Sequence, residues 1–156
     1  MLYPLGSQII VKNVMTNQQA FLEGHSNDVS CLAVSKDGRT LATGQRNSNV
    51  TPAHVLVWDL DAAKRNCDEK RRDDALIHRL HQHLGAVQDL DFSYDDKYLA
   101  TLGGQDDNAV VVWDAGSGTA ICGAPASDDT GLTLRWLNQR SDRFVTAGNY
   151  HLRVWQ

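Results

Sequence analysis

A short pattern recurs along this chain, and its repetition limits the possible folds more than any other feature. The stretch GHSNDVSCLAVSKDGRTLATG begins at Gly24 and is followed by VLVWDL. The same order returns in HLGAVQDLDFSYDDKYLATLGG, which begins at His83 and is followed by VVVWD. Trp58 and Trp113 lie 55 positions apart, and Trp113 and Trp155 lie 42 apart. A repeat length of about 40–45 residues is typical of proteins in which each repeat forms one small β-sheet. Such sheets bury their apolar faces against one another.

Local composition predicts strands for these units. Short runs rich in Val, Ile, Leu and Thr alternate with Gly, Asp, Asn and Ser, and the apolar spacing typical of helices is nearly absent. Residues 29–35, VSCLAVS, carry no charge, so we expect a strand packed on both faces. The expected strands are residues 8–14, 18–22, 29–35, 40–45, 54–60, 75–82, 87–93, 98–103, 109–114, 119–122, 132–138, 143–147 and 151–155.

The repeats divide the chain into four units. Residues 1–24 end one unit, in which QIIVKN stands in the place of VLVWDL and Lys12 replaces the Trp. Residues 25–82 and 83–124 form two complete units, and residues 125–156 form an incomplete one. We expect 156 residues to be a segment of a longer protein, with open sheet edges that prevent it from folding stably as a monomer.

Composition excludes several classes of protein. Apolar residues make up 42% of the chain, too many for wholesale disorder, and a net charge of -4 argues against nucleic-acid binding. No apolar run is long enough for a membrane helix, and the N-terminus does not resemble a secretory signal. Cys31, Cys67 and Cys122 show no CxxC spacing, so we expect neither disulfides nor zinc, and a location in the reducing cytoplasm.

The recurring residues resemble those of WD40-repeat proteins over nearly the whole chain, residues 61–74 excepted. The resemblance implies an all-β fold, a partial β-propeller whose blades are four-stranded antiparallel sheets. It also implies a hydrogen-bonded network in each blade. This network joins the His of Gly-His, a Ser or Thr of the second strand, an Asp of the following turn and the Trp of Trp-Asp. Buried indole and imidazole groups need such partners.

The three units match this network unevenly. In the second complete unit all four positions are filled, although Gln82 replaces the Gly before the His. In the first, no Asp falls in the expanded turn, and in the last an Asn replaces the Asp and no Gly-His precedes LTLRW. The expected network residues are His25, Thr43 and Trp58; His83, Thr101, Asp107 and Trp113; and Thr146, Asn149 and Trp155.

Residues 61–74, DAAKRNCDEKRRDD, form a charged insert with no net charge. We expect a solvated loop that extends a hairpin. The alternative is a partner-docking loop that binds an acidic surface and weakens as salt rises. The basic residues of this loop are Lys64, Arg65, Lys70, Arg71 and Arg72.

Motifs for catalysis are missing from the sequence. His78, His81 and His83 are close in sequence, but on a strand only two of them share a face, so we expect no metal site. The acidic pairs at 95–96 and 106–107 fit turns, where Asp bonds its own backbone. We therefore expect no enzyme activity, no cofactor and no small-molecule substrate.

Four stretches resemble the cilia- and flagella-associated members of the WD40-repeat family in particular. AICGAPA is the most specific of them, because the general repeat pattern does not dictate it. The resemblance implies a non-catalytic microtubule inner protein in the lumen of axonemal doublet microtubules, bound to tubulin and other lumenal axonemal proteins. The stretches are residues 21–45, 98–114, 120–126 and 144–156.

Two other functions stay open. A generic WD40 adaptor would recruit protein partners into a soluble complex, and it would present basic and aromatic groups at the mouth of the channel. The turn segments show no such cluster. An enzyme on a propeller would need converging polar residues at the channel, and this portion of sequence has none.

Overall fold

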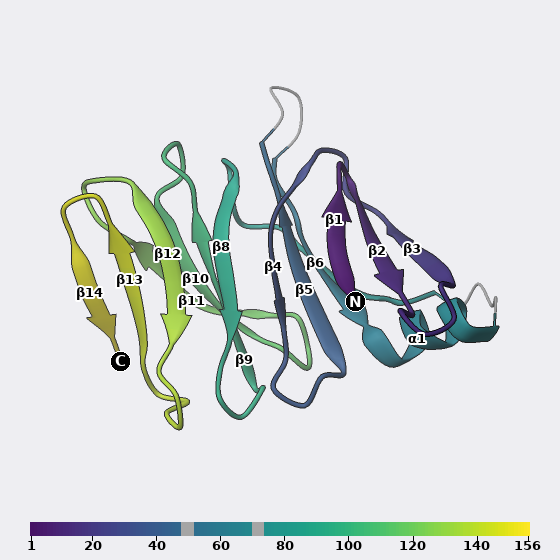
Figure 1. Ribbon diagram of the computed structural model, residues 1–156. Helices are drawn as coiled ribbons and strands as arrows, with labels where there is room; N and C mark the ends of the chain where they lie inside the picture. Colours follow the sequence, from purple (N-terminus) through teal and green to yellow (C-terminus); the bar gives the residue numbers. More distant parts are fainter. Residues whose placement is uncertain (48–51, 70–73) are drawn as a thin grey trace.

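A computed structural model describes residues 1–47, 52–69 and 74–156, and these form antiparallel sheets with one helix (Figure 1). The expected all-β architecture is confirmed. No helix in the described part of the chain has the length and apolar character to cross a membrane. The elements are β1 (Leu2–Leu5), β2 (Gln8–Lys12), β3 (Gln19–Glu23), β4 (Val29–Val34), β5 (Thr40–Gln45), β6 (Val55–Asp59), α1 (Leu60–Glu69), β7 (Leu76–Leu80), β8 (Val87–Phe92), β9 (Tyr98–Gly103), β10 (Ala109–Asp114), β11 (Ala120–Pro125), β12 (Gly131–Trp136), β13 (Phe144–Gly148) and β14 (Leu152–Trp155).

The strands form four sheets in which neighbours in space are neighbours in sequence. The first sheet has the order β1-β2-β3, the second β4-β5-β6-β7, the third β8-β9-β10-β11 and the fourth β12-β13-β14. The sheets stand side by side in chain order, and β8 lies between β4 and β12 (Figure 1). Each copy of the sequence repeat thus corresponds to one sheet.

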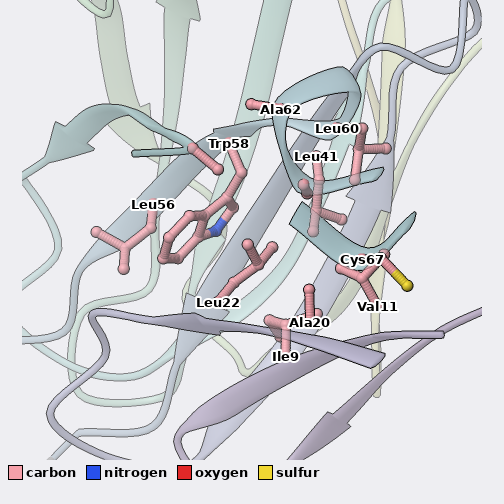
Figure 2. Packing of buried hydrophobic residues seen from close by; sticks show 12 residues of the cluster. Ile9, Val11, Ala20, Leu22, Leu41, Leu56, Trp58, Leu60, Ala62 and Cys67 are labelled. Carbon is pink, nitrogen blue, oxygen red and sulfur yellow. The ribbon is translucent and has the colours of Figure 1, made fainter. Parts of the chain in front are cut away.

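Apolar cores fill the spaces between successive sheets. Figure 2 shows the first, in which Ile9 and Leu22 of the first sheet face Leu41 and Trp58 of the second. Side chains that alternate along a strand point to opposite faces, so strands such as β6 are apolar on both and serve two cores. The second core includes Val57, Leu90, Phe92 and Trp113, and the third includes Leu102, Leu134 and Trp136.

The hairpin between β4 and β5 is set by its own side chains. The Ser35 hydroxyl donates to Asp37 Oδ1 at 2.6 Å and accepts from the Thr40 backbone N–H at 2.9 Å. Gly38 has a φ of +73°, the left-handed conformation that glycine adopts without strain. The hydrogen bond from Ser35 lowers the pKa of Asp37, so the turn keeps an ionised carboxylate.

The β8–β9 hairpin repeats this chemistry. Ser93 donates to Asp95 Oδ1 at 2.8 Å and accepts from the Tyr98 N–H at 3.0 Å. Burial opposes ionisation of Asp95, but hydrogen bonds from Ser93, Ser141 and Lys97 lower its pKa to about 2. The motif Ser-x-Asp therefore explains why both units turn at the same point.

Asp96 joins these two hairpins across the sheets. It occupies the place of Gly38 with a φ of 58°. Its carboxylate accepts from the backbone N–H groups of Lys36 at 2.7 Å and Asp37 at 2.9 Å. Of the acidic pair 95–96, Asp95 thus bonds within its own turn and Asp96 bonds the turn of the neighbouring sheet.

Two strand predictions need correction. β1 was not among the expected strands, and it contains Pro4, a residue that is unfavourable inside a sheet. Its position at the edge of the first sheet explains how Pro4 is tolerated, since no neighbour on that side needs its missing N–H. The expectation that residues 29–35 are packed on both faces is wrong over β4, where Ser30 and Val34 are exposed. β4 is the edge of its sheet, so only part of it is covered.

The prediction of a loop for residues 61–74 is wrong over residues 61–69, which belong to α1. Asp59 Oδ1 accepts from the backbone N–H groups of Asp61 at 2.8 Å and Ala62 at 3.1 Å, as a helix N-cap does. The buried side chains recur at helical spacing, and the charged ones face solvent. The buried residues are Leu60, Ala62, Ala63 and Cys67.

α1 connects the second sheet to the first. It begins at the end of β6 and packs against β2 and β3 (Figure 1). The Cys67 thiol donates to the Gln18 carbonyl at 3.2 Å, and Asn13 Nδ2 donates to Asp68 Oδ1 at 2.8 Å. Residues 61–69 of the insert therefore cover the end of the first core instead of extending into solvent.

We predict that Asp59→Ala lowers the free energy of unfolding by about 1 kcal/mol, because two N–H groups of the first helical turn lose their acceptor. Urea unfolding of the intact protein measures the change. Asp59→Asn is the matched control, since its side-chain oxygen can still accept and most of the stability is retained. Equal losses in both variants would contradict the capping role.

Candidate functional site

In the second sheet a chain of hydrogen bonds leads from a buried Trp to the surface end of the sheet. Trp58 Nε1 donates to Thr43 Oγ1 at 2.9 Å, and Thr43 Oγ1 lies 2.7 Å from His25 Nε2. His25 Nδ1 lies 2.9 Å from Gln45 Oε1. Since an amide oxygen only accepts, Nδ1 carries the proton and Nε2 accepts from the Thr43 hydroxyl. We call this chain of four residues the relay of the second sheet.

Gln45 is a relay member that the sequence did not reveal. Its Oε1 also accepts from the backbone N–H of Ser26 at 3.3 Å, and its Nε2 donates to the Ser26 hydroxyl at 3.0 Å. Gln45 is 0% exposed, so these hydrogen bonds compensate for the hydration that its amide loses. It fills the role that the family pattern gives to an Asp, from a strand rather than from a turn.

The third sheet has an equivalent relay that ends on a carboxylate. Trp113 Nε1 donates to Thr101 Oγ1 at 3.0 Å, and Thr101 Oγ1 lies 2.7 Å from His83 Nε2. His83 Nδ1 is hydrogen-bonded to Asp107 Oδ2. Here the residue that corresponds to Gln45 is Gly103, and a Cβ at that position would collide with the Asp107 carboxylate. The missing side chain makes room for the carboxylate.

The fourth sheet has a different arrangement. Trp155 Nε1 donates to Thr146 Oγ1 at 2.9 Å, but Asn149 is exposed in the bend after β13. Ser127 stands at the place of His25 and His83, four residues before the first residue of its strand.

His151 approaches Ser127 from the β13–β14 turn. The Ser127 hydroxyl lies 3.0 Å from His151 Nδ1. Gly148 leaves the space for this ring, because a Cβ there would collide with it. In the fourth sheet a serine thus stands where the second and third sheets have a histidine, and His151 rather than Asn149 makes the contact.

Asp89 of β8 joins the third sheet to the fourth. Its Oδ2 accepts from Thr133 Oγ1 at 2.7 Å, the Leu134 N–H at 2.9 Å and Arg135 Nη1 at 2.7 Å. The carboxylate is mostly buried, and these charge-assisted bonds compensate for its lost hydration. No pattern in the sequence indicated that a strand carboxylate would bind the next repeat.

Asp91 makes a second contact of this kind. Its Oδ2 accepts from the Trp136 N–H at 2.9 Å, and its carbonyl accepts from Trp136 Nε1 at 3.0 Å. Burial raises the pKa of Asp91, against the effect of the Trp136 bond. The first strands of the third and fourth sheets, β8 and β12, are therefore linked through polar as well as apolar contacts.

Only part of the expected docking loop can be placed. Lys64 and Arg65 lie on the exposed side of α1. Lys64 Nζ donates to the Gly38 carbonyl at 3.2 Å and lies 3.4 Å from Asp61 Oδ1. Lys70, Arg71 and Arg72 lie outside the described residues.

The three neighbouring histidines have separate environments. His78 Nε2 lies 2.9 Å from the Gly116 carbonyl, and the His81 ring contacts His54 with a centroid separation of 4.3 Å. His83 belongs to the third relay. Within residues 1–47, 52–69 and 74–156, no three His, Cys, Asp or Glu side chains are grouped to hold a metal ion.

The other reactive groups are also engaged in structure. The acidic pair 106–107 supplies the carboxylate of the third relay. Burial raises the pKa of the Cys31 thiol to about 12, so it is not a thiolate at neutral pH. These groups stabilise sheets, and their positions do not form a nucleophile and base pair.

A groove of about 320 Å³ lies between the third and fourth sheets beside the unpaired edge of β14. Tyr98, Trp136, Phe144 and Trp155 line it. The Phe144 and Trp155 rings stack with centroids 5.8 Å apart. This lining is of the same kind as the cores between the other sheets, so we assign no ligand to the groove.

Comparison with protein families agrees with this geometry. The family described as WD domain, G-beta repeat matches residues 16–51 and 74–114. The chain therefore carries WD40 repeats, on the antiparallel propeller-type sheets that WD40-repeat proteins share.

Among curated proteins, the chain is 44% identical over 155 residues to Cilia- and flagella-associated protein 52 of Chlamydomonas reinhardtii. It is 39% identical over 159 residues to the Homo sapiens protein of that name. These matches cover 99% and 100% of this chain but only 23% and 24% of the relatives. The chain thus spans about a quarter of the length of the curated relatives it matches.

Solved structures support the fold. One, described as the structure of U3-55K, matches with a TM-score of 0.75 and 24% identity over 96% of this chain and 42% of that chain. Another, from the crystal structure of the mitotic checkpoint complex, matches with a TM-score of 0.77 and 20% identity over 99% of this chain and 44% of that chain. At such identities the likeness concerns the fold alone.

We predict that Thr101→Ala lowers the free energy of unfolding by about 2–3 kcal/mol, because the buried Trp113 N–H and His83 Nε2 both lose their partner. Thr101→Ser keeps the hydroxyl and loses one methyl group, which costs about 1 kcal/mol. Urea unfolding monitored by Trp fluorescence compares the two variants. If Ser were as destabilising as Ala, packing rather than hydrogen bonding would account for the loss.

Proposed function

We propose that this chain is part of a non-catalytic scaffold of cilia and flagella. The observation that carries the proposal is its identity of 44% to Cilia- and flagella-associated protein 52 of Chlamydomonas reinhardtii, over 99% of the chain. Similarity at that level extends through all four sheets, not only through the repeat motifs. We further propose a location in the lumen of axonemal doublet microtubules, with tubulin and neighbouring lumenal proteins as partners.

The chemistry of the described residues supports a scaffold without catalysis. The relay groups of the second and third sheets bond one another inside the sheets, and Asp89 and Asp96 bond neighbouring repeats. Such groups stabilise a rigid stack and leave recognition to the turns and outer surfaces. A rigid stack of sheets suits a protein that reinforces a lattice.

An adaptor in a soluble complex is the second candidate. The observation in its favour is that the same fold occurs in the mitotic checkpoint complex, so the sheets alone do not select a microtubule partner. The two candidates differ in how firmly the protein is held by the axoneme.

The insert is the proposed partner-docking segment. Lys64 and Arg65 lie on the outer side of α1, away from the buried residues Ala63 and Cys67. We propose that these two residues, with Lys70, Arg71 and Arg72, contact an acidic surface of a neighbouring protein.

The location is tested with the tagged full-length protein in ciliated cells. Axonemes are isolated and extracted with detergent and then with high salt. A lumenal protein is expected to stay with the doublets until the microtubules themselves are disrupted, because the lattice encloses it. Release into the detergent-soluble fraction would overturn the lumenal location and favour the adaptor.

We predict that the double variant Lys70→Glu/Arg72→Glu is incorporated into axonemes several times less than the unmodified protein, because it reverses charge on the docking segment. The measurement is the fraction of tagged protein that is recovered in isolated axonemes. Lys36→Glu/Arg46→Glu is the matched control, with the same charge change at exposed positions elsewhere. Equal incorporation of the two variants would contradict a docking role for the insert.

A further inference from the structure

The relays of the second and third sheets differ at one end. His25 Nδ1 faces the neutral amide oxygen of Gln45, whereas His83 Nδ1 faces the carboxylate of Asp107. A carboxylate stabilises a protonated imidazole next to it, and an amide does so far less. The two relays therefore have the same order of hydrogen bonds and differ in the group that faces the histidine Nδ1.

The surroundings of His25 also disfavour a positive charge. Arg79 of β7 donates from Nη1 to the Gly24 carbonyl at 3.1 Å, next to His25 in the chain. His54, which precedes β6, has its ring against His81 of the turn after β7. In the part of the chain that the structure describes, the charged and titratable groups acting on His25 are Arg79 and His54, and none is a carboxylate.

The burial of His25 acts in the same direction. Burial is the main cause that lowers the pKa of His25; the Gln45 hydrogen bond opposes it, and the charges of Arg79 and His54 lower the pKa further by smaller amounts. The pKa of His54 is lowered as well, by burial and then by His81 and Arg79. His25 and His54 therefore resist protonation together.

Protonation of His25 would also change its hydrogen bond to Thr43, because Nε2 would become a donor instead of an acceptor. In the neutral form His25 Nε2 accepts from the Thr43 hydroxyl, which accepts from Trp58. A proton on Nε2 would point at an oxygen that already accepts from the indole. The Thr43 hydroxyl would then have to turn to the Leu56 carbonyl, 3.4 Å away, a long and weak bond.

We propose that the second sheet contains an acid-sensitive latch, formed by His25, Thr43 and Gln45, that opens on protonation of His25. Opening frees residues 24–28, the connection between the first and second sheets. The corresponding segment of the third sheet, residues 82–86, stays closed over the same pH range, because there a carboxylate and not an amide faces the histidine Nδ1.

The sign of the pH dependence follows from the direction of the shift. A histidine with a lowered pKa in the folded state contributes its full stability above its ordinary pKa of about 6.5. That contribution is lost as pH falls below about 6.5 toward the lowered value, because the open form binds the proton more tightly. Asp37 and Asp95 titrate at lower pH, since their pKa values lie below the ordinary value of 3.8.

Hydrogen exchange of the intact protein between pH 7.5 and 5 tests the latch, with rates corrected for the intrinsic effect of pH. We expect the protection of residues 24–28 to fall by up to about tenfold per pH unit once His25 is the titrating group, while that of residues 82–86 changes little. Parallel loss in both segments, or no loss in either, would overturn the proposal.

Two substitutions exchange the amide and the carboxylate that face the histidine Nδ1 in the two relays. Gln45→Glu provides a carboxylate for His25 and is expected to move the opening to lower pH. Asp107→Asn removes the carboxylate from His83 and is expected to give residues 82–86 the acid sensitivity of residues 24–28. Unchanged pH profiles in folded variants would contradict the proposal.

A measurement on the unmodified protein keeps the proposal testable if the variants do not fold. The nitrogen chemical shifts of His25 distinguish the neutral ring with the proton on Nδ1 from the charged ring. We expect the neutral Nδ1–H form at pH 6.5, with charging only where residues 24–28 lose protection. A charged His25 in a fully protected segment would overturn the latch.

Discussion

Burial of one sheet against the next is the constraint on which the rest of this structure depends. A sheet of three or four strands cannot cover its own apolar face, so each repeat needs a neighbour. Strands with few charges, such as VLVWD in β6, serve the core on either side. A Trp recurs on the third strand of the second, third and fourth sheets, in β6, β10 and β14, where it packs against a core between sheets.

A Trp placed in such a core brings a polar group with it. The indole N–H must find an acceptor, and a threonine on the adjacent strand provides it in the second, third and fourth sheets. The threonine hydroxyl then needs an acceptor of its own. In two sheets this acceptor is a histidine Nε2, and the N–H on the other side of the histidine ring requires a further acceptor. The polar residues of the repeat thus depend on one another in order, and their variation appears mainly at the far end, at Gln45, Asp107 and His151.

The sequence could predict the strands and the first members of each relay, because apolar runs and the Trp and Thr positions recur in the same order in each repeat. It could not predict Gln45 or His151, because their roles depend on the size of the side chain at one strand position. That position holds Gln45 in the second sheet, Gly103 in the third and Gly148 in the fourth, and the two glycines leave room for a side chain from the following turn. The role of Asp89 was hidden for a related reason, because its partners belong to the next repeat, 44 to 46 residues away.

The helix α1 was missed because its charged residues dominate the composition of the insert. Its apolar positions, Leu60, Ala63 and Cys67, are few but lie at helical spacing, and Asp59 precedes them as a cap. Asp114, the corresponding residue of the third sheet, accepts from Ser117 in a short turn instead. The same Trp-Asp motif therefore begins a helix or closes a hairpin, depending on the residues that come after the Asp. A repeat fold can thus acquire a new surface between two strands without altering its cores. In this chain that surface carries Lys64 and Arg65 on its exposed side, while Ala63 and Cys67 on the other side extend the first core.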